Sequence, residues 1–159
     1  MNWNIKPGDS FLLSQMNEEE IRKHTDREYK PGFSGWPNTF NGLVCEHIMT
    51  DLLGYTNDDR AFKDVFNPDG ISVEVKSYTK SRENAEKFKQ DVLHNGYMGS
   101  KGWVSPLWER KVLWKKDISN HVVFFERDDE LQKYICDELF EWNNKEQRYF
   151  SVQSREAVV

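Results

Sequence analysis

The sequence predicts a mixed α/β fold in which α-helices flank one central β-sheet. Apolar residues recur at helical spacing over residues 40–53 and 128–143, which indicates two amphipathic helices. Residues 61–66, 71–77 and 120–126 are instead short apolar or alternating runs of the kind that form strands. At 159 residues the chain is long enough for one domain with its own hydrophobic core.

The first predicted element is a short helix over residues 17–28, with Asn17 as its N-cap and acidic residues in its first turn. Residues 30–38 follow as a loop, because two prolines and two glycines within this short stretch interrupt any regular element. The stronger helical pattern therefore begins after this loop.

The second predicted helix, over residues 40–53, is closed by Gly54, a residue type that commonly ends helices. Glu46 lies beside Leu53, at the border between the buried side of this helix and water. A carboxylate in that position can point along the surface into a cleft. The residues on the apolar arc are Val44, Cys45, Ile48, Met49 and Leu52.

The sequence Asn-Pro-Asp-Gly at residues 67–70 predicts a tight turn that joins the first two strands into a hairpin. Pro68 presets φ at the second turn position, and Gly70 can take the left-handed conformation. A type I turn followed by a glycine bulge gives a loop of three residues, 68–70. A two-residue loop is the alternative, and it would shift the register of the two strands by one position.

With the three-residue loop, Asp64 lies directly opposite Glu74, and the two carboxylates share one face of the sheet. Directly opposed Cβ atoms are about 4.5–5.5 Å apart, close enough for both side chains to hold one divalent cation. Asp69 lies at the hairpin tip, about 17 Å of extended strand away from Glu74. Asp64 is therefore the candidate ligand, and Asp69 is interpreted as a turn residue.

Glu74 and Lys76 are two residues apart in one strand and project from the same face, whereas Val73 and Val75 point the other way, into the core. Charged residues are unusual in an otherwise apolar strand, since buried charges are rarely kept unless they are paired or bind a metal. The alternative is an exposed hairpin face on which Asp64, Glu74 and Lys76 form a salt bridge.

Beyond the hairpin, residues 79–93 are compatible with a helix, and residues 96–106 are glycine-rich and irregular. A short strand is predicted near residues 111–114. The strand at 120–126 and the helix at 128–143 complete the predicted order: helix, hairpin, helix, strand, helix.

Composition narrows the class of protein. No apolar run approaches the roughly 20 residues needed to span a bilayer, and the two cysteines, Cys45 and Cys136, lie far apart without a disulfide or metal-binding motif. A cytoplasmic location without a membrane partner is therefore expected. The net charge of −5 is unevenly distributed, since residues 76–116 contain ten Lys or Arg and four acidic residues. Such a basic segment can face phosphate groups, although a solvated helix and loop would have the same composition.

The acid within NGLVCEHIMTDLLGY, the aspartate of KDVF, the short hairpin and the tripeptide Glu-Val-Lys together resemble the PD-(D/E)xK nuclease superfamily, which has the restriction-endonuclease-like fold. The resemblance covers about residues 40–77, a quarter of the chain. It assigns the catalytic aspartate to Asp64, which no proline precedes, rather than to the literal Pro-Asp pair at 68–69.

The resemblance implies a role for each of these residues. Asp64, Glu74 and the carbonyl of Val75 would bind Mg²⁺, for which Mn²⁺ could substitute. Lys76 would orient or help to deprotonate the attacking water and steady the charge at phosphorus. Glu46 would bind the metal through water, or bind a second metal. The implied activity is hydrolysis of a DNA phosphodiester bond.

The expected organisation is one nuclease domain over residues 1–159, with a catalytic core at 40–143. Residues 1–39 match no motif and are a candidate extension for DNA specificity or dimerisation. One small domain carries one site, so cutting both strands of DNA implies a homodimer. The expected enzyme is a Mg²⁺-dependent DNA endonuclease of bacterial or phage origin, of the sequence-specific restriction or homing type. Two alternatives stay open: a junction resolvase or repair nicking enzyme, and a non-catalytic nucleic-acid-binding module that keeps the fold.

Seven residues are candidate DNA contacts. Four basic residues that follow the Glu-x-Lys strand could neutralise phosphates: Lys80, Arg82, Lys87 and Lys89. Three residues of the glycine-rich segment could enter a groove or stack on bases: Tyr97, Lys101 and Trp103. Surface lysines and a half-buried aromatic residue would have the same sequence pattern.

Overall fold

The computed structural model describes residues 3–28, 36–57, 64–95 and 119–158. Within these ranges the chain forms a mixed sheet with helices packed on its two faces, which confirms the predicted α/β class. A 3₁₀ turn follows β1, and a π-helical turn extends α2. In chain order the elements are β1 (Ser10–Leu12), α1 (Glu18–Glu28), α2 (Trp36–His47), β2 (Thr56–Asn57), β3 (Val65–Phe66), β4 (Ser72–Thr79), α3 (Ala85–Asn95), β5 (His121–Asp128), β6 (Lys133–Asn143) and β7 (Arg148–Ser151).

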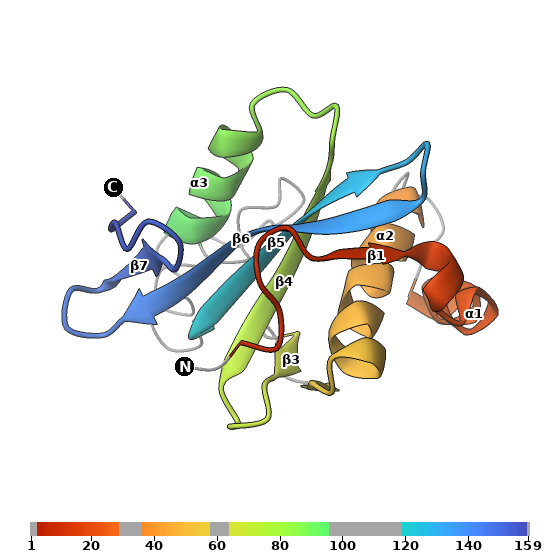
Figure 1. Cartoon of the computed structure of the whole chain (residues 1–159), viewed down its shortest axis with the longest axis horizontal. Coiled ribbons are helices and arrows are strands. Elements are labelled where there is room, and N and C mark those ends of the chain that lie inside the picture. The colour runs from red at the N-terminus through yellow and green to blue at the C-terminus, as the bar shows by residue number, and fades with distance from the viewer. Residues whose placement is uncertain (1–2, 29–35, 58–63, 96–118, 159) are drawn as a thin grey trace.

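The strands lie in the order β1-β6-β5-β4-β3-β2, and β7 also pairs with β6. β4 and β5 are parallel, whereas the other neighbouring pairs are antiparallel. Parallel strands need a crossover connection, and α3 lies in the connection between β4 and β5. Figure 1 shows α3 and α2 on opposite sides of the sheet.

Two hydrophobic cores cover the two faces of the sheet. The larger core lies under α2 and includes Val73 and Val75 of β4. The smaller core lies under α3 and includes Val122 and Phe124 of β5. Because side chains alternate across a strand, the valines of β4 face α2 as predicted, and Glu74 faces the side covered by α3.

Local capping residues set the ends of the first two helices. Asn17 is the N-cap of α1, since its Oδ1 accepts a hydrogen bond from the N–H of Glu20 (3.2 Å). Gly54 follows the π-helical turn with a φ of 79°, which ends this helical segment as predicted. α2 begins at Trp36, before residue 40, and takes in part of the predicted loop. Pro37 lies in the first turn, where its missing N–H is not needed.

The prediction of a helix over residues 128–143 is wrong, because most of this segment is β6. β5 skips Asp137 in its pairing with Cys136 and Glu138, so Asp137 is the extra residue of a β-bulge. The core-facing residues of β6 are therefore two positions apart before the bulge and three positions apart across it. This spacing resembles that of an amphipathic helix. The residues of β6 in the core under α2 are Tyr134, Cys136 and Leu139.

The other predicted elements lie close to their expected positions. β4 and β5 cover the predicted strands at 71–77 and 120–126, and β3 covers the described end of 61–66. α3 begins at Ala85, after a turn, rather than at residue 79. Two predictions lie outside the described residues: the strand near 111–114 and the irregular segment at 96–106.

The sheet extends beyond the predicted core of residues 40–143 in both directions. β1 pairs with the first part of β6, and β7 pairs with its last part. α1 packs against α2, so the described residues before residue 40 contribute to the same fold. The role of residues 1–39 in DNA specificity or dimerisation stays a prediction. In the part of the chain that the structure describes, no helix is long and apolar enough to cross a membrane.

Candidate metal-binding site

The hairpin between β3 and β4 has the predicted three-residue loop. Val65 pairs with Val73, which is the register expected for that loop length and not for a two-residue loop. Gly70 has a φ of 80°, the left-handed conformation that a glycine bulge requires. The same register carries Asp64, just before β3, to the position opposite Glu74.

Replacing Gly70 with alanine is expected to lower the free energy of unfolding by about 1–2 kcal/mol, because a Cβ is disfavoured at this positive φ. No atom of the residues that the structure describes lies within 4 Å of the added Cβ, so the change isolates backbone conformation from steric contact. Gly42→Ala in α2 is the control, since its Cβ would also meet nothing and it should gain up to about 1 kcal/mol. Urea unfolding measures both, and an unaffected Gly70→Ala protein would contradict the turn assignment.

Asp64 reaches across to the backbone of β4, and its Oδ2 accepts a hydrogen bond from the N–H of Val75 (2.8 Å). Glu74 is 5% exposed, and within the described part of the chain its Oε2 is a buried oxygen with no hydrogen-bond donor. Burying a carboxylate oxygen without a partner is costly, and a bound cation is one way to satisfy it. Asp69 is exposed at the hairpin tip, where its N–H donates to the side chain of Asn67 (2.9 Å), as expected of a turn residue.

Lys76 places a positive charge beside this pair. Its Nζ lies 3.4 Å from Oε1 of Glu74, and its side chain is 26% exposed. The two residues therefore share one face of β4, as predicted. Since Oε1 faces the ammonium, Oε2 is the oxygen of Glu74 that is left for another ligand.

The pKa of Glu74 is raised well above its ordinary value of 4.5. Burial is the main cause, because it disfavours the charged carboxylate, and the negative charge of Asp64 adds to the shift. Attraction to Lys76 lowers the pKa but does not cancel these effects. A cation bound between the two carboxylates would oppose both causes of the shift, so binding is expected to release a proton.

The donor set suits a small, hard cation. Mg²⁺ binds oxygen ligands, commonly one or two carboxylates, and keeps several water molecules. Asp64 and Glu74 supply two such carboxylates, and among the described residues Oε2 of Glu74 has no hydrogen-bond donor. Soft ligands such as thiolates are not part of this group, because Cys45 and Cys136 are buried in the core under α2.

Glu46 lies on α2 and is partly exposed, at the border where it was predicted. Over the described ranges, no three His, Cys, Asp or Glu side chains form a group that could hold a metal ion. The structure thus brings Asp64 and Glu74 together without gathering Glu46 into the same cluster. A contact of Glu46 with metal through water, or with a second metal, stays a prediction.

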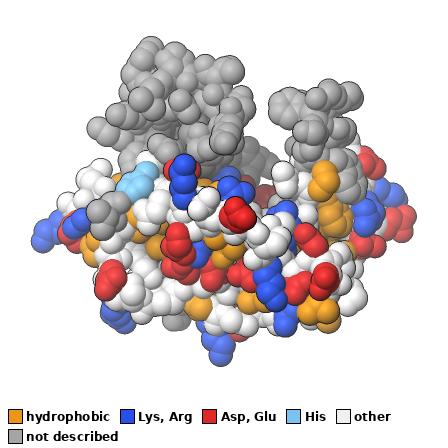
Figure 2. All heavy atoms as spheres, turned by 90° about the horizontal axis from the view of Figure 1, so that it is seen from above, with side chains coloured by type: hydrophobic (Ala, Val, Ile, Leu, Met, Phe, Trp, Pro, Cys, Tyr) orange, Lys and Arg blue, Asp and Glu red, His pale blue; other side chains and the backbone are white. Residues whose placement is uncertain are grey.

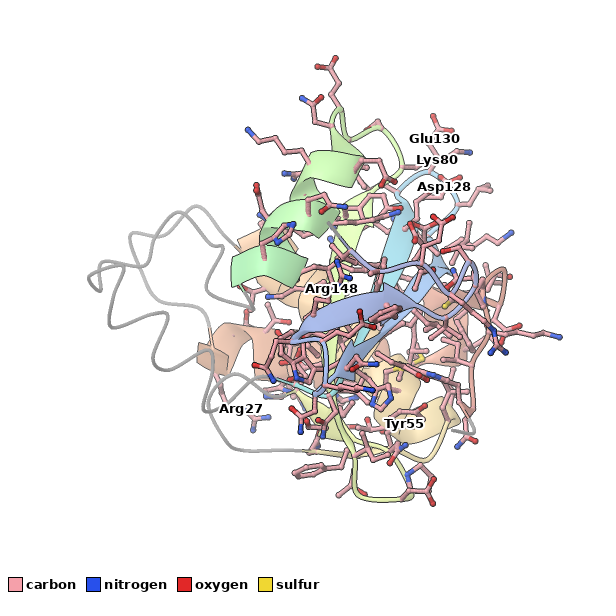
Figure 3. All side chains as sticks on the ribbon, turned by 90° about the vertical axis from the view of Figure 1, so that its left-hand side faces the viewer. Arg27, Tyr55, Lys80, Asp128, Glu130 and Arg148 are labelled. Carbon is pink, nitrogen blue, oxygen red and sulfur yellow. The ribbon has the colours of Figure 1, made fainter. Side chains whose placement is uncertain are left out.

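Three of the basic residues expected to contact DNA are exposed: Lys80, Arg82 and Lys87. Lys80 has acidic neighbours, since its Nζ lies 3.7 Å from Oδ2 of Asp128, and Figure 3 shows both beside Glu130. On the face shown in Figure 2, acidic and basic side chains are interspersed. Any phosphate contact on this face would therefore depend on individual residues. The expected contacts Tyr97, Lys101 and Trp103 lie outside the described residues.

The prediction that Lys89 contacts DNA is wrong. This residue is 4% exposed, and its ammonium lies 2.5 Å from Asp137, 2.6 Å from Glu138 and 3.2 Å from Glu86. A lysine that is buried among carboxylates does not present its charge to a phosphate. Two of its partners lie on β6, the strand whose sequence pattern resembles that of a helix.

Tyr149 of β7 is a neighbour of the site that the sequence did not indicate. It is buried, and its hydroxyl donates a hydrogen bond to the carbonyl oxygen of Ser119 (2.8 Å). Burial raises the pKa of Tyr149, and the negative charge of Glu74 raises it further, so the two side chains lie within electrostatic range. β7 lies beyond the predicted core, and no motif marked it.

No protein-family model matches the chain, and no curated protein has a significantly similar sequence. Function is therefore inferred from the chemistry of the site. That chemistry consists of two adjacent carboxylates, a buried oxygen to which no described residue donates a hydrogen bond, and a lysine on the same face of one strand.

Proposed function

We propose that the protein is a Mg²⁺-dependent DNA endonuclease with the restriction-endonuclease-like fold. The observation that carries this proposal is the pairing of Asp64 with Glu74 across a hairpin, with Lys76 beside them. The order of helix, hairpin and Glu-x-Lys strand adds support, because the resemblance to PD-(D/E)xK nucleases rests on that order.

Asp64 and Glu74 would hold Mg²⁺, with the carbonyl of Val75 as a further oxygen ligand, and Mn²⁺ would take the same place. When bound, the cation makes a nucleophile available near neutral pH and offsets charge on the phosphate oxygens. The reaction is hydrolysis by in-line attack. A bond forms between the water oxygen and phosphorus as the bond from phosphorus to the leaving oxygen breaks.

Lys76 is the residue that would act on the attacking water and the phosphate. Its ammonium is anchored at Glu74, and its partial exposure leaves it within reach of a substrate on the sheet face. An ammonium has three donors, so Lys76 can hold Glu74 and also donate to a phosphate oxygen. A positive charge held in place in this way stabilises the negative charge that develops on the phosphate.

A sequence-specific enzyme of the restriction or homing type is the first interpretation within this class. Each chain would carry one site and cut one strand. Cleavage of both strands would then require a homodimer on a twofold-symmetric DNA site. Glu46 would add a water-mediated contact to the metal, or hold a second cation.

The decisive experiment compares two aspartates of the same hairpin. Supercoiled plasmid and phage genomic DNA are incubated with the wild type, Asp64→Asn and Asp69→Asn in Mg²⁺, with EDTA as the metal-free control. We expect Asp64→Asn to lower the cleavage rate about 10²–10³-fold, the usual effect of losing one group that stabilises transition-state charge. Asp69→Asn should cleave like the wild type, because Asp69 is exposed at the hairpin tip.

The pattern of products separates the possible outcomes. Discrete bands that depend on Mg²⁺ and on Asp64 would support sequence-specific cleavage. Nicked circles alone would indicate a nicking or junction-resolving enzyme. Equal cleavage by the wild type and Asp64→Asn would contradict the site. Folded protein that cuts no DNA in Mg²⁺ or Mn²⁺ would replace the enzyme proposal with a binding module.

A further inference from the structure

The cluster around Lys89 borders the candidate site along β4. The ammonium of Lys89 lies between Asp137 and Glu138 and is 5.5 Å from the centre of the Tyr78 ring. The hydroxyl of Tyr78 donates a hydrogen bond to Asp137. Tyr78 follows Lys76 by two residues on β4, so both side chains project from the same face. α3, β4 and β6 therefore meet at this cluster.

The β-bulge of β6 brings two acidic residues to one ammonium. In a regular strand, successive side chains point to opposite faces of the sheet. Because Asp137 is the extra residue of the bulge, Asp137 and Glu138 both reach Lys89, at 2.5 Å and 2.6 Å. Bulges frequently redirect a side chain next to an active site.

These two acids are also potential partners of Lys76. Lys76 pairs with Phe124 of β5, and Phe124 pairs with Glu138 of β6, so the three residues form one row across the sheet. With neighbouring strands about 4.8 Å apart, the Cα atoms of Lys76 and Glu138 are separated by about 10 Å, which their two long side chains can bridge. In the absence of another cation, Asp137 and Glu138 would compete with Glu74 for Lys76.

We propose that Lys89 is a positioning residue for Lys76: by neutralising Asp137 and Glu138, it leaves Lys76 paired with Glu74. Burial alone would lower the pKa of Lys89, but its hydrogen bonds to Asp137 and Glu138 outweigh burial and raise the pKa. Lys89 therefore stays charged at neutral pH. The consequence for cleavage rests on the proposed function, whereas the position of Lys76 does not.

Crystal structures of two variants test the position directly. In Lys89→Met, we expect Nζ of Lys76 to leave Glu74 and to lie within salt-bridge distance of Asp137 or Glu138. In Lys89→Met/Asp137→Asn/Glu138→Gln, the competing charges are absent, and Lys76 should stay at Glu74. If Lys89→Met does not fold, Lys89→Met/Asp137→Asn replaces it, because only Glu138 is then left uncompensated. Lys76 still beside Glu74 in the first variant, or displaced in the triple variant, would overturn the proposal.

The same variants give a kinetic measurement if the wild type cleaves DNA. We expect Lys89→Met to lower kcat about 10–100-fold with little change in KM, as for other residues that orient a ligand, and the triple variant to restore kcat. The triple variant also removes the uncompensated acids and should regain stability. The crystal structures therefore separate a positioning role, in which Lys76 moves in Lys89→Met, from a purely structural one, in which Lys76 stays at Glu74. Lys145→Met, which removes an exposed lysine elsewhere, is the control. A wild type that does not cleave would refute the proposed function alone, and the crystal structures would still decide where Lys76 lies.

Discussion

Replacing Glu74 with glutamine is expected to abolish Mg²⁺-dependent cleavage while it stabilises the metal-free protein at neutral pH. The amide keeps the shape of the side chain but removes the charge that would hold the cation beside Asp64. Metal-ion catalysis is worth several kcal/mol of transition-state stabilisation. Because each 1.36 kcal/mol changes the rate tenfold, we expect kcat to fall by at least about 10²–10³-fold. Cleavage of plasmid DNA at saturating Mg²⁺ measures this loss.

The Glu74→Gln protein is expected to gain stability although it loses activity, because the pKa of Glu74 is raised in the folded protein. The folded state then binds more protons than the unfolded state. The contribution of Glu74 to stability is therefore fully present below its ordinary pKa of 4.5 and is lost as pH rises through the pKa of the folded protein. Each tenfold difference in proton affinity between the folded and unfolded states corresponds to about 1.4 kcal/mol of this loss. Glutamine does not titrate, so the variant should exceed the wild type in stability at pH 8 and not at pH 4.

Urea unfolding in EDTA, from pH 4 to pH 9, measures this difference. Glu130→Gln is the matched control, since it removes one carboxyl from an exposed turn. A Glu74→Gln protein that gains no stability with rising pH would contradict the burial of this carboxyl. Full cleavage by the same protein would contradict its role as a metal ligand.

Replacing Lys89 with methionine is expected to lower the free energy of unfolding by about 3–5 kcal/mol, because it removes the buried ammonium that Asp137 and Glu138 share. Typical domains are stable by only about 5–15 kcal/mol, so this loss would be a large share of the total stability. Lys23→Met provides the comparison, because Lys23 also pairs with a glutamate but is 71% exposed. Its loss should stay below about 1 kcal/mol. Urea unfolding at neutral pH measures both, and similar values would show that the buried cluster contributes little.

The hairpin of the candidate site could be predicted because its determinants are local. The residues of the 67–70 turn define the loop, and the alternation of β4 then decides which side chains share a face. The local pattern places Asp64 opposite Glu74, and Val65 pairs with Val73 as that register requires. The end of the second helical segment at Gly54 was equally local.

The errors arose where structure depends on distant residues. The sequence of β6 predicts a helix because the bulge at Asp137 breaks the regular alternation that is typical of strands. The burial of Lys89 among acidic side chains could not be predicted from the sequence for a related reason. Glu138 is 49 residues away in the sequence, so a lysine among surface-like neighbours gave no indication of burial. Only the folded sheet brings α3 over β6.

The loop of residues 68–70 has a consequence for how this protein can diverge. Exposed hairpin tips usually tolerate insertions and deletions better than any other part of a domain. Here a gain or loss of one residue that shifted the pairing would turn every side chain of β3 to the other face, and Asp64 would point toward α2. The length of this turn should therefore be under as strong a selection as the carboxylates themselves, although its own side chains lie at the exposed tip.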